Sequence, residues 1–414
     1  MYNDNHDVDL FKAPQSRGQK FIDDLNRIRE HDPVYWSESS QCWIVSRFQD
    51  VVDGFHLKYP LMNGGKNEFS LVSIPPEERD ARIPTLKKYV NCWIVGVDAP
   101  QHTRLRRLMM QAFTKKMVEK LRPYVRERVN QLLDQAMATP EIEFNEEIAR
   151  PLPGSVIFKL AGIPEEHFPS LKEWSIAVVE GMVTAVPPPE VLERTEWAMN
   201  EIDRVVLAEL EKRKLEPRDD LLTAFLHASE DGDTLSMDEL LSSMLVVIVA
   251  GHDTTSNTMT LGLEALSRHP DAWQYMYENP DKIPQCVNEL MRYVAMTGGQ
   301  PRNVGEDFEW HGKQLKKGDI VFLSVIGANR DPRAFEDPER LDFTRDVSES
   351  QVFAPGVHHC IGHLLAKMQL CEFFSALVQR FERVEVLDEE LKFMPVSIFR
   401  GLYELNVRFH PRLS

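Results

Sequence analysis

The residue best suited to chemistry by its type and surroundings is Cys360, in the segment FAPGVHHCIGHLLAK, between Gly356 and Gly362. A helical pattern begins directly after it, and a helix N-terminus brings unpaired N–H groups and a positive dipole end close to the sulfur. Both favour the thiolate, which is the form of cysteine that binds a metal. The glycines allow the backbone to approach a flat ligand closely. His358 is a donor within reach of a carboxylate on such a ligand.

The local sequence leaves three interpretations of Cys360 open. The thiol is a buried small group on a loop, a metal ligand, or the nucleophile of a thiol hydrolase with His358 or His359 as its base. The remaining cysteines are Cys42, Cys92, Cys286 and Cys371. Their number with Cys360 is odd and no CxxC pair occurs, which argues against a disulfide framework and a structural zinc site.

A second group of polar residues interrupts the apolar stretch LVVIVAGHDTTSN, on a helix predicted from Ser236 to about Arg268. An otherwise apolar helix does not bury Asp253 and two hydroxyl groups without a reason. A threonine can bond back to the carbonyl four residues earlier, so Thr255 alone has a purely structural explanation. The acid and its neighbour Thr254 therefore call for a functional explanation.

Two further pairs share a helix face. His102 and Arg106 are four residues apart in VDAPQHTRLRRLMMQAFT, and Glu289 and Arg292 are three apart in ELMR. The alternatives are a basic, solvated helix for the first pair and a surface ion pair of little energetic value for the second.

The cysteine segment closely resembles the haem-binding signature of the cytochrome P450 superfamily: a phenylalanine, two glycine-type positions, a basic residue, then cysteine and glycine. The matching residues are Phe353, Ala354, Gly356, His358, Cys360 and Gly362. Ala354 stands where the family usually has glycine. The resemblance extends to nearly the whole chain. It implies the mainly α cytochrome P450 fold with a small β subregion, and haem b with Cys360 as the ligand of its iron.

The resemblance also implies a role for AGHDTT. Ala250 and Gly251 would leave room for O2 beside the iron, and Asp253 and Thr254 would guide protons to it. His252 occupies a variable position and receives no role. A haem-binding protein without oxygenase activity, such as a sensor or a peroxide-using relative, remains an alternative, and the intact Asp253–Thr254 pair argues against it.

The resemblance implies that further matched positions lie around the haem. The residues expected to bind its propionates are His102, Arg106, Arg302 and His358, and a structural network of Glu289, Arg292 and Arg345 is expected to hold the haem loop. Arginine suits the first role because its planar fork pairs with carboxylates.

The implied activity is a monooxygenase that hydroxylates or epoxidises a hydrophobic small molecule, with a place in secondary metabolism. By position, the expected substrate contacts are Trp93, Ile94, Val179, Met182, Val246, Val249, Val294, Ile398 and Phe399. Electrons would come from a ferredoxin or flavodoxin type donor with its reductase. A docking site for that acidic donor is expected at Arg104, Arg107, Lys115 and Lys116.

Composition is consistent with this reading. The chain has 414 residues and a formal net charge of −17, which argues against a nucleic-acid binder. The N-terminus lacks an apolar signal core. The longest strongly apolar run, Met244 to Gly251, is far shorter than the roughly 20 residues of a membrane span. We expect a cytoplasmic protein without a membrane anchor.

The elements that must position these residues are mostly helical. Helical patterns cover 21–32, 102–133, 153–180, 190–213, 236–268, 284–293 and 361–381, and 61–97 is expected to be a long loop with short helices. Ser236 and Glu239 have the spacing of a capping box. We expect one domain over 1–414, with β-rich parts near 34–60, 300–330 and 384–409.

Overall fold

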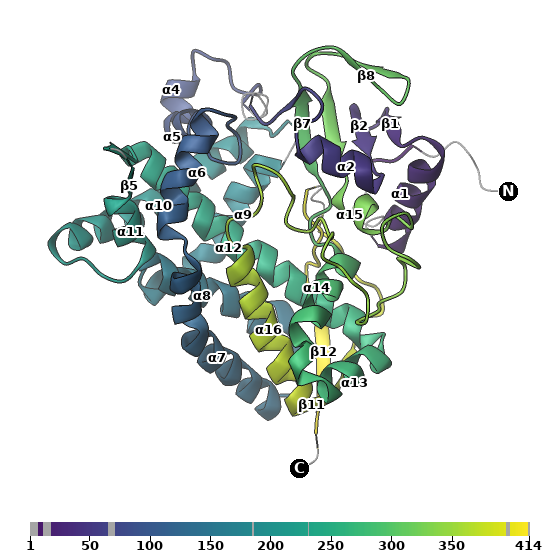
Figure 1. The fold of residues 1–414 in the computed structure, drawn as a ribbon. Helices are drawn as coiled ribbons and strands as arrows, with labels where there is room; N and C mark the ends of the chain where they lie inside the picture. The colour runs from purple at the N-terminus through teal and green to yellow at the C-terminus, as the bar shows by residue number, and fades with distance from the viewer. Residues whose placement is uncertain are drawn as a thin grey trace.

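A computed structural model describes residues 7–10, 18–64, 71–183, 186–230, 232–394 and 398–412 (Figure 1). Its α-helices are α1 (Gln19–His31), α2 (Phe48–Phe55), α4 (Arg79–Arg82), α5 (Pro84–Tyr89), α6 (Gln101–Ala112), α7 (Lys115–Ala138), α8 (Pro151–Ala161), α9 (Phe168–Val183), α10 (Pro189–Leu215), α11 (Leu221–His227), α12 (Met237–Ser267), α13 (Pro270–Glu278), α14 (Ile283–Val294), α15 (Val325–Asn329) and α16 (His363–Arg380). There are also a short π-helix, η2 (Asn145–Ala149), and two short 3-10 helices, η3 (Glu165–His167) and η4 (Pro280–Lys282).

The strands form small sheets. They are β1 (Val34–Ser37), β2 (Cys42–Val45), β3 (Leu61–Met62), β4 (Glu141–Glu143), β5 (Ser229–Glu230), β6 (Asp233–Thr234), β7 (Gln300–Val304), β8 (Phe308–Trp310), β9 (Lys313–Leu315), β10 (Ile320–Leu323), β11 (Phe381–Val386) and β12 (Asn406–Pro411). The largest sheet has the order β1-β2-β10-β7-β3, in which β2 and β10 are parallel and the other pairs antiparallel. A second sheet has the order β11-β12-β4, and β5-β6 and β8-β9 are separate pairs.

The long helix α12 begins as its sequence predicts. The Ser236 hydroxyl accepts a hydrogen bond from the Glu239 N–H, and the Glu239 carboxylate accepts one from the Ser236 N–H. These two bonds satisfy orphan N–H groups at the helix start. The apolar sides of α12 pack against α8, α14 and α10, inside the main core.

Three expected elements differ in the structure. The predicted helix at 102–133 is two helices, because α6 ends at Ala112 and Thr114 caps α7 by accepting a hydrogen bond from the Met117 N–H. The helix expected at 153–180 is likewise divided into α8 and α9, with Gly162 in the left-handed conformation (φ 79°) between them. Within the β-rich 34–60 range, residues 48–55 form helix α2 instead.

Figure 1 shows how these elements surround the centre of the molecule. The large sheet and α1 and α2 lie on one side, and α7, α8 and α16 lie towards the other, with α12 passing between. Apolar residues of α2 pack against one part of the sheet and those of α1 against another, as two smaller cores. Within the described ranges, no helix is both long enough and apolar enough to span a membrane.

Candidate functional site

One cavity brings together the cysteine segment, α6, α12 and β7. Of the residues named from the sequence, those that line it are Ile94, His102, Arg106, Val246, Ala250, Gly251, Thr254, Thr255, Arg302, Phe353, Ala354, His358, His359, Cys360, Gly362 and Phe399. They come from distant parts of the sequence, so the fold assembles the cavity. Its remaining walls are largely apolar side chains, including Leu365 and Leu370 of α16.

The loop before α16 has a fixed path. The Cys360 N–H donates to the Phe353 carbonyl oxygen at 3.0 Å, and the His359 N–H donates to Gly356 at 3.1 Å. Gly356 has φ 87°, and a Cβ there would lie 2.4 Å from the carbonyl oxygen of Phe55. Only glycine fits this position, because both the conformation and the close backbone approach exclude a side chain.

The electrostatics at Cys360 differ from the sequence expectation. Burial raises the pKa of its thiol, and the N–H groups of Gly362 and His363, with the charge of Arg106, lower it less. The low-dielectric surroundings therefore outweigh the helix N-terminus. A cation bound at the sulfur would reverse this balance and deprotonate the thiol.

The same balance argues against a thiol hydrolase. A nucleophilic cysteine needs a lowered pKa. Moreover, the nearby histidines have other contacts: His363 Nδ1 lies 2.9 Å from the Cys360 carbonyl oxygen, and the His358 ring centroid lies 3.9 Å from that of His102.

The basic residues of the cavity carry more positive charge than the protein balances. His102 and Arg302 are each 3% exposed, and His102 Nε2 and Arg302 Nε have no hydrogen-bond partner among the described residues. Burial lowers the pKa of Arg302 to about 10, and burial also lowers the pKa values of His102 and Arg106. Asp98 counteracts the effect at His102 and Arg302. However, its carboxylate oxygens already accept the N–H groups of residues 63 and 64.

This donor set fits haem. Buried cations without a bonded anion are costly, and a ligand with two carboxylates would supply the missing acceptors. A cysteine thiol that a bound cation would convert to the thiolate lies in the same cavity, and apolar walls suit a flat, hydrophobic ring. His102, Arg106, Arg302 and His358 would hold the carboxylates, and Cys360 would bind the iron.

On α12, the cavity is lined by Ala250, Gly251 and Thr254 but not by Asp253. The Thr254 hydroxyl donates to the Ala250 carbonyl oxygen at 2.7 Å. Asp253 Oδ1 lies 3.0 Å from Nδ1 of the buried His252. A Cβ at Gly251 would lie 2.5 Å from Cδ1 of Ile157, so this glycine also lets α12 approach α8 closely.

The expected substrate contacts divide into two groups. Ile94, Val246 and Phe399 line the cavity, and Trp93, Val179, Val249, Val294 and Ile398 do not. The side chain of Met182 lies outside the described residues. The rotation of α12 explains one difference, because Val246, Val247, Ala250 and Gly251 share the cavity face and Val249 is buried in the core on another face.

Several lining residues were not found from the sequence. They are Asn63, Val95, Met109, Phe113, Ile157, Val247, Thr258, Met291, Met296, Thr297, Gln300, Val352, Ile361, Leu365, Ala366, Gln369 and Leu370. Helical spacing could have identified Thr258, which lies four residues after Thr254. No sequence signal pointed to Asn63.

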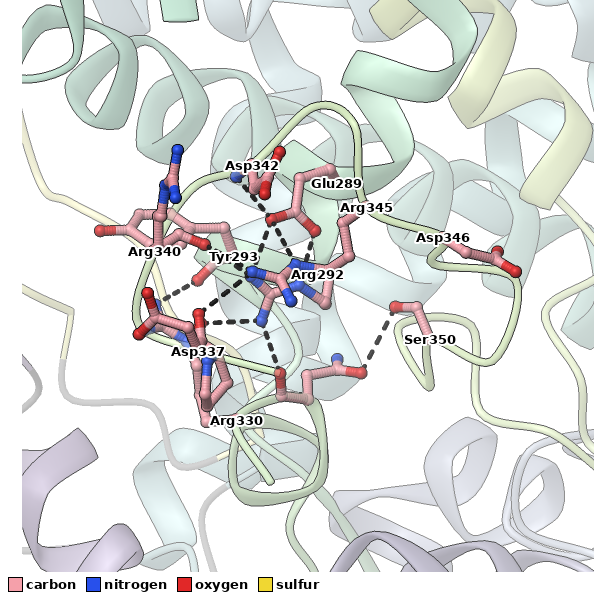
Figure 2. A network of polar contacts seen from close by, with 12 residues as sticks. Glu289, Arg292, Tyr293, Arg330, Asp337, Arg340, Asp342, Arg345, Asp346 and Ser350 are labelled. Carbon is pink, nitrogen blue, oxygen red and sulfur yellow. Dashed lines mark hydrogen bonds and ion pairs between the residues drawn. The ribbon is translucent and has the colours of Figure 1, made fainter. Parts of the chain in front are cut away.

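Glu289, Arg292 and Arg345 do not line the cavity. They form the predicted network, which Figure 2 shows from close by. Arg292 donates to both oxygens of Glu289 at 2.6 and 2.9 Å, and both side chains are completely buried. Arg345 Nε donates to Glu289 at 3.3 Å. The guanidinium of Arg292 also donates to the carbonyls of Asn329 and Pro338.

This network is linked to the cysteine loop. The Asn329 side chain accepts the Gln351 N–H at 2.9 Å, and the Gln351 carbonyl accepts the Ala354 N–H at 3.0 Å. Through these bonds, the buried ion pair of α14 holds the start of the segment that ends at Cys360.

We predict that Glu289→Gln lowers the free energy of unfolding by about 3–5 kcal/mol, because Arg292 would remain buried without a counter-charge. Urea unfolding measures the loss. Glu201→Gln is the matched control: Glu201 and Arg204 have the same three-residue spacing, but Glu201 is only half-buried and Arg204 is exposed, so the cost should stay below about 1 kcal/mol. Equal losses in the two variants would contradict this account of the buried pair.

Comparisons with known proteins identify the family. A family model described as cytochrome P450 matches residues 186–398. The chain is 34% identical over 417 residues to cytochrome P450 CYP107DY1 of Priestia megaterium, covering 97% of this chain and 99% of the relative. It is 31% identical over 412 residues to the mycinamicin IV hydroxylase/epoxidase of Micromonospora griseorubida, covering 98% and 97%. The solved structure of the bacillaene polyketide synthase cytochrome P450 PksS of Bacillus subtilis superposes with a TM-score of 0.84 at 29% identity, covering 96% of this chain and 99% of that chain. The chain therefore belongs to the cytochrome P450 family of haem-thiolate monooxygenases.

Proposed function

We propose that this protein hydroxylates or epoxidises a hydrophobic small molecule of secondary metabolism, using O2 and a haem b held by Cys360. The observation that carries the proposal is the shared cavity, which joins Cys360, Thr254 and the unbalanced basic residues within apolar walls. When bound, the haem supplies the activation of O2. The names of the hydroxylase/epoxidase and polyketide-synthase relatives support the reaction types and the metabolic setting.

The chain's own residues have separable roles in this proposal. Ile94, Val246 and Phe399 present apolar surface, which favours a hydrophobic substrate and excludes water from its contacts. The Thr254 hydroxyl donates a hydrogen bond to the Ala250 carbonyl oxygen, which leaves the lone pairs of the hydroxyl oxygen to accept a hydrogen bond from water. Asp253 would replenish protons from outside the cavity, since its carboxylate lies off the lining.

Cys360→Ala tests the iron ligand. The reduced wild-type protein with carbon monoxide should show the red-shifted Soret band of a thiolate-ligated haem, and Cys360→Ala should lose it. Absorption spectroscopy on the purified proteins gives the answer, with Cys371→Ala as a control that removes a cysteine outside the cavity. A wild-type protein that takes up no haem, or a variant that keeps the band, would refute the assignment.

Thr254→Ala tests the proton path. Product formed per electron pair consumed should fall by roughly tenfold or more, because the proton-delivering water would lose the hydroxyl oxygen that positions it. Thr258→Ala is the matched control, since Thr258 also lines the cavity and donates to a carbonyl four residues earlier, at Thr254. Its coupling should stay near that of the wild type, and equal coupling in all three proteins would remove Thr254 from the path.

We also propose that a ferredoxin or flavodoxin type donor docks at Arg107, Lys115 and Lys116, which are exposed. We leave out Arg104, the fourth residue expected there, because it forms ion pairs with Asp233 and Glu239, both at 2.6 Å. The charge of Arg104 is thus largely neutralised within the protein. The docking site therefore centres on the end of α6 and the start of α7.

Reversing these charges should slow reduction by the donor. Arg107→Glu and Lys115→Glu should each lower the rate several-fold at low salt, with a smaller difference at high salt because exposed charges are screened. Stopped-flow reduction measures the rate. Lys20→Glu is the control, since exposed Lys20 lies on α1, on the other side of the molecule in Figure 1. Equal slowing by Lys20→Glu would indicate a net-charge effect without a local site.

A further inference from the structure

Asn63 lies next to Arg302 across the end of a strand pair. Strands β3 and β7 are antiparallel, with Leu61 opposite Val304 and Met62 opposite Asn303. The same register, continued by one residue, places Asn63 opposite Arg302. Residues opposite each other in an antiparallel pair have Cβ atoms about 4.5–5.5 Å apart and side chains on one face. Both residues line the cavity.

The main chain at Asn63 is held in place independently of its side chain. The N–H groups of Asn63 and Gly64 donate to the two oxygens of Asp98 at 2.9 and 2.7 Å. The Asn303 side chain donates to the Gly64 carbonyl at 2.8 Å. The position of the Asn63 side chain is therefore set by the turn and by the neighbouring strand.

The Asn63 amide is a buried donor without an acceptor. The residue is 2% exposed, and its Nδ2 has no hydrogen-bond partner among the described residues. Arg302 Nε and His102 Nε2 are in the same situation in the same cavity. A buried donor left unsatisfied costs about 1–3 kcal/mol. Two such donors, with His102 Nε2 as a third in the tautomer that carries its proton there, point to an anionic acceptor shared around one cavity.

We propose that Asn63 binds the haem, by donating an Nδ2–H to the propionate that Arg302 also binds. The inference rests on the proposed haem site and adds to it a residue that no sequence motif indicated. A neutral amide beside Arg302 adds a hydrogen bond without adding charge to a cavity that already holds an excess of buried cations. Asp98 fixes the turn that presents this amide.

Haem transfer to apomyoglobin tests the proposal with a readout that is independent of activity. Asn63→Leu removes the donor at similar size, and the ferric protein should lose haem roughly tenfold faster, as expected for one hydrogen bond to a charged group. Asn63→Asp has the shape of the native side chain but turns a carboxylate towards the propionate, and it should lose haem faster still. The change in Soret absorbance gives each rate.

Asn303→Leu is the matched control. It removes the bond to the Gly64 carbonyl and leaves Asn63 intact, so it should loosen the turn with a smaller effect on haem loss. Melting temperatures of the haem-loaded variants show whether the turn has been disrupted. The proposal is overturned if both Asn63 variants lose haem at the wild-type rate, or if Asn303→Leu matches them.

Substrate binding provides a second discrimination. If Asn63 faced the substrate, its variants would weaken the spin-state shift of a bound ligand and leave haem loss unchanged, which would also overturn the proposal. A wild-type protein without haem would instead refute the proposed function itself. The failure of the haem site and the failure of the Asn63 assignment are therefore distinguishable.

Discussion

The path of the loop that carries Cys360 depends on a fully buried ion pair between Glu289 and Arg292. The two charges are removed from water, so the pair stabilises the fold weakly, if at all, relative to apolar side chains of the same volume. The pair instead fixes the path of the chain, because Arg292 donates hydrogen bonds to carbonyl oxygens in the segment before the cysteine loop. An apolar substitute could fill the space but could not fix the path of that loop.

A second feature of the cavity is the buried positive charge of Arg302, which no carboxylate of the described residues neutralises by a direct bond. Arg302 is buried without a bonded carboxylate, and its guanidinium lies 5.3 Å from the centroid of the Phe55 ring. Such an arrangement is unfavourable for the protein alone and favourable with an anionic ligand. The cavity is therefore preorganised at a cost in stability, which binding of the cofactor would recover.

Local sequence signals predicted the parts of the site that local geometry determines. The capping box at Ser236 starts α12, and the cysteine lies at the N-terminus of α16 as expected. Long-range matches to the family placed His102 and Arg302 at one cavity. The first two features depend on short motifs with a fixed spacing, whereas the pairing of His102 with Arg302 was expected only from the family resemblance.

The residues that could not be predicted depend on pairing between distant segments. Asn63 reaches the cavity through the register of β3 on β7, and no pattern near residue 63 encodes that register. The neutralisation of Arg104 could not be predicted, because its acidic partners lie more than 100 residues later in the sequence. Val249 faces the core because packing against α8 sets the rotation of α12, which helical periodicity alone leaves undetermined.

Ala354 gives the cysteine loop an energetic character of its own. Its φ of 49° is left-handed, which costs an alanine about 1–2 kcal/mol. Alanine also has fewer conformations than glycine in the unfolded chain, which returns about 0.4–1 kcal/mol, and its methyl group packs against the core beside α2. Ala354 therefore adds backbone strain to the folded loop, and its methyl group anchors the loop to the core on the sheet side of the molecule. Part of the compensation arises in the unfolded chain, which loses less conformational entropy on folding than it would with glycine.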